Sequence, residues 1–143
     1  MKFQDDTNLH RLVEKIRLWG EQLGFQQIGI ADIDLGEHED RLNQWLEQDM
    51  HGDMEYMQRH GSLRSHPEEL VPGTLRVISA RMDYLPGEGV DPEELLLQAD
   101  KGYISRYALG RDYHKLIRKR LQQLASRIEQ ATGSLGYRVF TDS

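Results

Sequence analysis

A short segment of the 143-residue sequence concentrates side chains that can bind a polar ligand. Residues 104–114 read Ile-Ser-Arg-Tyr-Ala-Leu-Gly-Arg-Asp-Tyr-His and directly precede the most regular helical pattern of the chain. Hydroxyl, guanidinium and helix-N-terminal amide donors placed together in this way suit an acidic or amide-rich ligand. The structural alternative is that Tyr107 and Tyr113 pack under the helix, Asp112 caps it and the arginines are solvated.

Asp142 and Arg64 are two further candidates, each with an ordinary explanation. Asp142 follows an apolar run, and α/β folds often place chemistry at the carboxyl end of a strand. Burial of its carboxyl group would raise the pKa until it could donate a proton. Asp142 can equally begin a turn, and Arg64, in a loop before Pro72-Gly73, is by itself a surface arginine.

A group of acidic and histidine side chains in residues 51–66 could be imagined as metal ligands: His51, Asp53, Glu55, His60 and His66. Their spacing matches no standard ligand set. We interpret them as a solvated face with helix caps, and we predict no metal site.

Charge and cysteine content narrow the possible functions. The chain carries 18 basic and 24 acidic residues, a net charge of -6, which argues against a protein that coats nucleic acid. Residues 101–127 nevertheless hold eight basic residues and one acidic residue. This basic segment could contact phosphates, or its charges could simply be solvated. The sequence has no cysteine, which excludes disulfides, thiolate nucleophiles and cysteine-ligated clusters within these residues.

Hydrophobic periodicity predicts alternating helices and strands. We expect helices over 9–23, around 42–46 and over 113–131, a short helix within 51–57, and one helical turn at 93–97. Thr7 is the expected N-cap of the first helix and Gly24 its stop. Strands are expected over 25–33, 75–85 and 137–140. These elements indicate a single α+β domain over residues 1–143, with a mixed β-sheet flanked by helices.

The sequence shows no pattern typical of a targeting signal. The amino terminus is polar and no apolar stretch approaches 18 residues, so we expect a cytoplasmic protein with no signal peptide and no membrane contact.

Four motifs, in order along the chain, closely resemble the amino-terminal domain of the epoxyqueuosine reductase family. They are His51-Gly-Asp-Met-Glu-Tyr-Met57, Leu70-Val-Pro-Gly-Thr-Leu-Arg-Val-Ile78, Ser105 to His114, and Phe140-Thr-Asp-Ser143. The resemblance covers essentially all 143 positions.

The resemblance implies a cobalamin-binding domain, related in fold to flavin nitroreductases and to vitamin B12 processing and reductive dehalogenase proteins. In this family a ferredoxin-like domain with two 4Fe-4S clusters follows and feeds electrons to the cobalt. Reduced cobalamin then converts the epoxide of epoxyqueuosine in tRNA to the alkene of queuosine. The implied partners are this tRNA and an electron donor to the clusters, and a monomer is expected.

The resemblance also assigns residues. Asp142 matches the strand-end aspartate that acts as proton donor beside the cofactor, and Arg64 matches a cobalamin contact. Ser105, Arg106 and Tyr107 fall in the loop expected to meet the corrin or its amides.

The missing cluster cysteines predict that the chain is a fragment, inactive as a reductase by itself, which continues into a C-x-x-C-x-x-C-x-x-x-C-P run. A non-catalytic flavin or corrinoid carrier, or a partner-binding domain, is the alternative.

Overall fold

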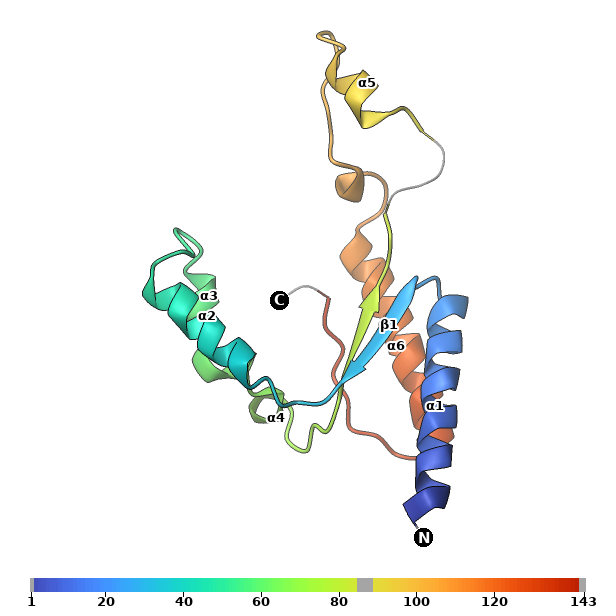
Figure 1. Cartoon of the computed structure of the whole chain (residues 1–143). Helices are drawn as coiled ribbons and strands as arrows, with labels where there is room; N and C mark the ends of the chain where they lie inside the picture. Colours follow the sequence, from blue (N-terminus) through green and yellow to red (C-terminus); the bar gives the residue numbers. More distant parts are fainter. Residues whose placement is uncertain (1, 85–88, 142–143) are drawn as a thin grey trace. The chain divides into compact units, whose positions relative to one another are not determined.

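The computed structural model describes residues 2–84 and 89–141 (Figure 1). Three longer helices and two strands make up the regular structure, joined by short helical turns. In chain order these are α1 (Lys2–Gln22), β1 (Gln27–Ala31), α2 (Glu37–Glu47), α3 (Tyr56–Arg59), η1 (Gly61–Arg64), α4 (Pro67–Leu70), β2 (Val77–Arg81), α5 (Pro92–Leu96), η2 (Arg106–Ala108) and α6 (Tyr113–Thr132).

The chain divides into two compact units. Unit 1 comprises residues 1–29, 80–135 and 139–143, and unit 2 comprises residues 30–79 and 136–138. The sheet of the described residues consists of β1 and β2. The Gln26 amide, just before β1, donates to the carbonyl of Arg81 at the end of β2, at 2.9 Å, so the two strands run antiparallel.

Unit 1 is built on the pairing of α1 with α6, which lie side by side in Figure 1. Leu124 and Ile128 stand four residues apart and therefore share one face of α6. Both are buried, as are Ile16 of α1 and Ile28 of β1, and Phe25 is only 2% exposed. This apolar cluster is the core that holds the helices against the start of β1.

Two glycines permit close approach within this core. A side chain at Gly20 of α1 would place its Cβ 2.5 Å from Cγ1 of Ile28, so only glycine lets the strand lie this close to the helix. Gly24 has a φ of +83°, and a Cβ there would meet the Arg120 guanidinium at 2.6 Å. Gly24 thus ends the turn after α1 and leaves room for the Arg120 side chain from α6.

The ends of α6 show why this sequence forms a long helix. The Asp112 carboxylate accepts from the His114 amide at 3.0 Å, an N-cap that satisfies one of the free donors of the first turn. Gly133, with a φ of +91°, closes the other end, and its amide donates to the Glu129 carbonyl at 2.9 Å. Arg127 also donates to Gln22 Oε1 at 2.8 Å and links α6 to the last turn of α1.

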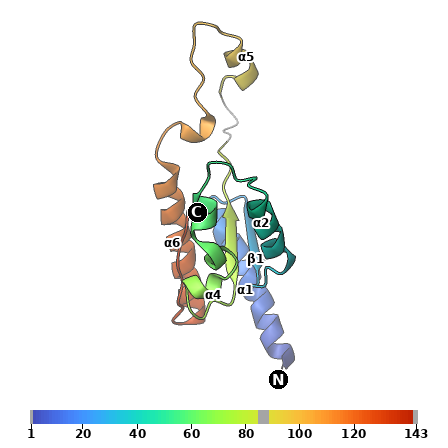
Figure 2. The same ribbon diagram turned by 90° about the vertical axis from the view of Figure 1, so that its left-hand side faces the viewer.

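The α5 segment projects from this unit, past the end at which α6 begins (Figure 2). Asp91 caps α5 by accepting from the Glu93 amide at 2.8 Å, and Pro92 occupies the first helical position. Leu96 and Leu97 are largely exposed. This helical turn is therefore formed by its local capping residues rather than by burial.

The structure corrects four expectations. Thr7 is not an N-cap, because α1 begins at Lys2 and includes it. The short helix expected within 51–57 begins only at Tyr56. Residues 137–140 have no regular secondary structure, and the sheet of the described chain is a two-stranded antiparallel pair instead of a mixed sheet. An apolar run predicts burial, whereas a strand also requires a regular series of hydrogen bonds to a neighbouring strand.

Candidate functional site

The loop before α6 is held in place by a hydrogen bond to a residue 16 positions earlier in the chain. Arg106, the first residue of η2, donates from Nη2 to the Val90 carbonyl at 2.8 Å. This bond joins two parts of the long segment between β2 and α6. Ser105, just before η2, is exposed, and its side chain makes no capping hydrogen bond. The hydroxyl of Ser105 is therefore available to a ligand, while Arg106 fixes the backbone around it.

A row of aromatic rings crosses the same loop. It includes one residue that the sequence analysis did not assign to the site. The rings of Tyr107 and Tyr113 meet edge to face with centroids 6.1 Å apart, and Tyr84, just after β2, meets Tyr107 in the same manner at 6.4 Å. His114 stacks on Tyr113 at 4.0 Å. Edge-to-face contact between aromatic rings is favourable, so these contacts stabilise the conformation of the loop.

Asp112 serves both the helix and the ring at its start. Its Oδ1 accepts the His114 amide and lies 3.0 Å from Nδ1 of the His114 ring. The hydrogen bond from the His114 side chain stabilises the carboxylate and lowers the pKa of Asp112 below its ordinary value. Asp112 thus caps the helix, as the structural alternative for this segment expects, and its carboxylate is already engaged.

The basic residues around this loop are mostly on the surface. Arg111, Lys115, Arg118 and Lys119 are exposed, as is Lys101. Arg106, Arg120 and Arg127 are half-buried instead. Arg120 lies over Gly24 and donates to Met82 Sδ at 3.0 Å. The eight basic residues predicted as one set therefore divide into exposed charges and residues that hold the unit together.

Arg64 lies in unit 2 and has a defined structural task. It ends η1, and its guanidinium donates through Nε to the Met57 carbonyl at 3.1 Å and through Nη2 to the Tyr56 carbonyl at 2.8 Å. These bonds satisfy carbonyl groups of the neighbouring short helix, α3. Arg64 is therefore not the freely solvated arginine of the simpler interpretation, and it organises the turn that carries the first of the four motifs.

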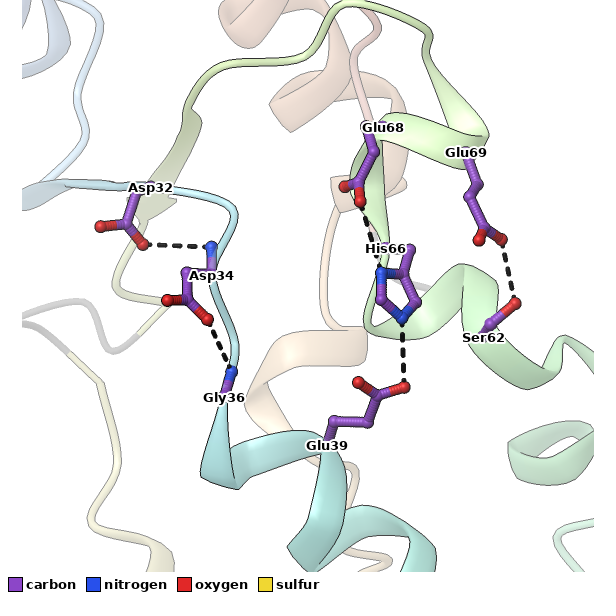
Figure 3. A network of polar contacts seen from close by, with 8 residues as sticks. All are labelled: Asp32, Asp34, Gly36, Glu39, Ser62, His66, Glu68 and Glu69. Atoms are coloured by element: carbon purple, nitrogen blue, oxygen red, sulfur yellow. Dashed lines mark hydrogen bonds and ion pairs between the residues drawn. The ribbon is translucent and has the colours of Figure 1, made fainter.

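A polar network in unit 2 surrounds His66 (Figure 3). Nε2 of His66 lies 3.3 Å from Glu39 of α2, and Nδ1 lies 3.3 Å from Glu68 of α4. Ser62 donates to Glu69 at 2.9 Å beside it. Because one ring bridges carboxylates from two helices, His66 connects α2 to α4 within this unit.

The pKa of His66 provides a test of this bridge. The hydrogen bond to Glu68 raises the pKa above its ordinary value of 6.5, and the charges of Glu39, Glu68 and Glu69 add to this against a smaller opposing effect of burial. The bridge therefore stabilises unit 2 fully below pH 6.5 and is lost as pH rises through the pKa of the folded ring. Glu68→Gln is expected to move the pKa of His66 down toward 6.5, measured by NMR titration of its ring protons.

The matched control for this titration is Glu55→Gln, which removes an exposed carboxylate from the same unit. It should leave the pKa of His66 unchanged. An equal fall in both variants would show that the pKa reflects overall charge rather than the bridge.

His51 differs from its expected solvated position. It is 6% exposed, with its ring tilted against Trp45 at 5.8 Å and with no partner for Nδ1. Among the residues that the structure describes, no three histidine, aspartate or glutamate side chains are grouped to hold a metal ion. The first motif is therefore a packed turn in which His51 contributes to the interior of unit 2.

The predicted site residues fall into three sets. Ser105, Arg106 and Tyr107 lie together on one loop of unit 1, and Arg64 lies in unit 2. Asp142 lies outside the described residues. The described part of the site is a half-exposed loop that offers a hydroxyl, a guanidinium, a phenol and an aromatic row, a donor set suited to an amide-rich or conjugated ligand.

Comparison with known proteins agrees with the four motifs. Residues 64–143 match the family described as Epoxyqueuosine reductase QueG, DUF1730. The chain is 62% identical over 133 residues to an epoxyqueuosine reductase from Pseudomonas aeruginosa, covering 93% of this chain and 37% of that protein. It is 54% identical over 139 residues to one from Escherichia coli, covering 97% and 36%. It is also 54% identical over 136 residues to one from Aliivibrio fischeri, covering 95% and 36%.

The chain thus spans little more than a third of the length of these relatives. No solved structure matches it. None of the helices in the described parts of the chain is long and apolar enough to cross a membrane. With the family model matching more than half of the chain and these identities extending over nearly all of it, the chain belongs to the epoxyqueuosine reductase family.

Proposed function

We propose that this chain is the cobalamin-binding part of an epoxyqueuosine reductase that acts on tRNA. The observation that carries the proposal is the 62% identity over 133 residues to a protein of that name. The exposed donor loop at residues 105–107 supports it, because such a loop suits a cofactor with a rim of amides. The chain would hold the cofactor and part of the substrate, while the rest of the protein would supply electrons.

The overall reaction requires two electrons and two protons. Both carbon–oxygen bonds of the epoxide break, a double bond forms between its two carbons, and the oxygen leaves as water once it has taken up both protons. Cobalamin, when bound, supplies the reducing electrons at the substrate. The protein must therefore orient the cofactor, exclude water from it and deliver a proton to the oxygen.

Two neighbouring residues are suited to orient the corrin. The Ser105 hydroxyl can donate to, or accept from, a side-chain amide of the corrin. Arg106 keeps one of its guanidinium nitrogens on the Val90 carbonyl, so its remaining donors are presented from a fixed position. Tyr107 adds a ring whose position is set by Tyr84 and Tyr113.

Arg64 and Asp142 are the two other residues that we assign to the cofactor or its reaction, from the family resemblance. The Arg64 guanidinium already donates to the Tyr56 and Met57 carbonyls. We therefore propose that Arg64 acts on the cofactor indirectly, by holding the turn that contains these two residues. Asp142 is the proposed acid, next to the cofactor. A carboxyl group donates near neutral pH only if its pKa is raised, and a dry, cofactor-covered pocket has that effect.

The iron–sulfur clusters do not fit this chain. Clusters of the 4Fe-4S type are held by cysteine thiolates, and the sequence has no cysteine. The clusters, and the electron donor that reduces them, would belong to the part of the relatives that this chain does not match. We propose that the complete protein is a monomer. We also propose that it acts in the cytoplasm, where its tRNA substrate is found.

The proposal is tested by the cofactor that the complete protein binds. Purified without oxygen, the protein that carries this chain should show the visible bands of a corrin and of iron–sulfur clusters together. With cofactor removed, Arg106→Met should weaken cobalamin binding by about tenfold, because hydrogen bonds from a charged donor to the cofactor and to the loop are both lost. Arg111→Met, at an exposed arginine of the same loop, is the control and should bind normally.

Addition of FMN to the same preparation separates this proposal from a flavin carrier. A shift of the visible spectrum with FMN and none with cobalamin would overturn it. So would a protein that binds cobalamin but leaves epoxyqueuosine in tRNA unchanged under reducing conditions.

A further inference from the structure

Tyr84 is an exposed ring that neither the motifs nor the proposed cofactor loop accounts for. It follows β2 and is 64% exposed, although it belongs to the aromatic row. Tyr107, its neighbour in the row, is 53% exposed. Tyrosines usually cover much of their ring on folding, so two exposed rings in contact with each other indicate a surface that binds a flat, conjugated partner.

The charge around these rings selects the kind of partner. Arg106 stands next to Tyr107 in the sequence, and residues 101–127 carry a net charge of +7. The carboxylates nearest in sequence are already engaged, since Asp83 pairs with Arg81 at 3.3 Å and Asp112 with His114 at 3.0 Å. Exposed aromatic rings in a segment that also carries exposed cations, such as Lys101, Arg111 and Lys115, are the chemistry that binds unpaired bases of RNA, by stacking on the rings and by contact with the phosphates.

We propose that Tyr84 is a substrate-positioning residue on which an unpaired base of the RNA stacks, beside the nucleoside to be reduced. The inference rests on the proposed function, because it places this base within that reaction. Tyr107 holds the Tyr84 ring edge to face at 6.4 Å, and Tyr107 belongs to the loop assigned to the cofactor. A base on Tyr84 therefore lies one ring away from that loop, where a neighbouring nucleoside can reach the cofactor.

The geometry favours unpaired bases over a duplex. In a duplex each base is covered by its neighbours and only edges and phosphates are open, so a ring has no face to stack on. Bases of a hairpin loop can turn outward and stack. The structure thus predicts a preference for the loop of a hairpin RNA that depends on the Tyr84 ring.

The experiment measures binding of the complete protein to two RNAs by fluorescence anisotropy. One is a hairpin with a seven-nucleotide loop, and the other is a blunt duplex with the same stem sequence. Tyr84→Leu is expected to weaken hairpin binding by about tenfold, as removal of one stacking ring does, and to leave duplex binding unchanged. Tyr84→Phe keeps the ring and should bind within about twofold of the unaltered protein.

Two controls give the result its meaning. Tyr56→Leu removes another exposed tyrosine, from unit 2, and should bind both RNAs normally. The salt dependence of hairpin binding should be the same for Tyr84→Leu as for the unaltered protein, because no phosphate contact is removed. The cobalamin bands should also be unchanged, which separates a role toward RNA from a role toward the cofactor.

Several outcomes would overturn the inference. Hairpin binding that is insensitive to Tyr84→Leu, or an equal loss for hairpin and duplex, would exclude base stacking. A lowered melting temperature with normal RNA binding would show that another segment of the protein covers Tyr84. A protein that reduces epoxyqueuosine without any need for the Tyr84 ring removes this inference alone, whereas a protein that binds RNA through Tyr84 but cannot reduce the epoxide removes the proposed function alone.

Discussion

Asp142→Asn in the complete protein is expected to slow reduction of epoxyqueuosine by about 100-fold or more, the usual contribution of a positioned proton donor. Asparagine has nearly the shape of aspartic acid, so the pocket should keep its form, but its amide cannot deliver a proton to the oxygen. The rate is measured as conversion of epoxyqueuosine in tRNA under reducing conditions. Cobalamin binding, followed by its visible spectrum, should be unaltered.

The control for Asp142 is Asp100→Asn, which alters an exposed aspartate of unit 1 and should react at the normal rate. The pH dependence adds a second readout. If Asp142 is the acid, the rate of the unaltered protein should fall as pH rises through the raised pKa of this carboxyl group, and the variant should lose that fall. A normal rate for Asp142→Asn would remove the acid role.

Phe25→Ala is expected to lower the free energy of unfolding of the chain by about 3–5 kcal/mol, the usual cost of removing a buried phenylalanine ring. Phe25 is 2% exposed, and its amide donates to the Gly20 carbonyl at 3.0 Å, so both its backbone and its ring are part of the turn between α1 and β1. The void cannot close easily, because Gly20 and Ile28 are already in close contact. The measurement is urea unfolding followed by far-ultraviolet circular dichroism.

Leu9→Ala is the matched control for the core. Leu9 lies on α1 but is 58% exposed, so its loss should change stability by no more than about 0.5 kcal/mol. Comparable losses for Phe25→Ala and Leu9→Ala would mean that the turn after α1 is not the centre of the core. A loss for Phe25→Ala alone would show that burial at this point decides whether unit 1 forms.

Local signals in the sequence predict much of the secondary structure. The helix predicted at 113–131 is α6, Tyr113–Thr132, with Asp112 as its N-cap and Gly133 at its carboxyl end. The turn predicted at 93–97 is α5, and the strands predicted in 25–33 and 75–85 contain β1 and β2. These features depend on capping residues, glycines and apolar periodicity within a few residues of one another, which is why the sequence reveals them.

Expectations failed where a distant partner decides the outcome. Residues 137–140 are mainly apolar, which predicts a strand, but the sheet of the described chain contains only β1 and β2. His51 is polar and lies between turns, yet it is buried against Trp45. A pattern read along the chain contains no information about which neighbour will cover a side chain or complete a ladder.

The sequence by itself determined the family, through four ordered motifs, and it placed Ser105, Arg106 and Tyr107 on one loop because they adjoin one another. Only the tertiary structure showed that Arg106 is tied to Val90, and that Tyr84 meets Tyr107 across the long segment after β2. It also showed that the Arg64 guanidinium is engaged by carbonyl groups of α3. Motifs are local in the chain, whereas the contacts that fix a guanidinium or leave a ring open join residues far apart in sequence and exist only after folding.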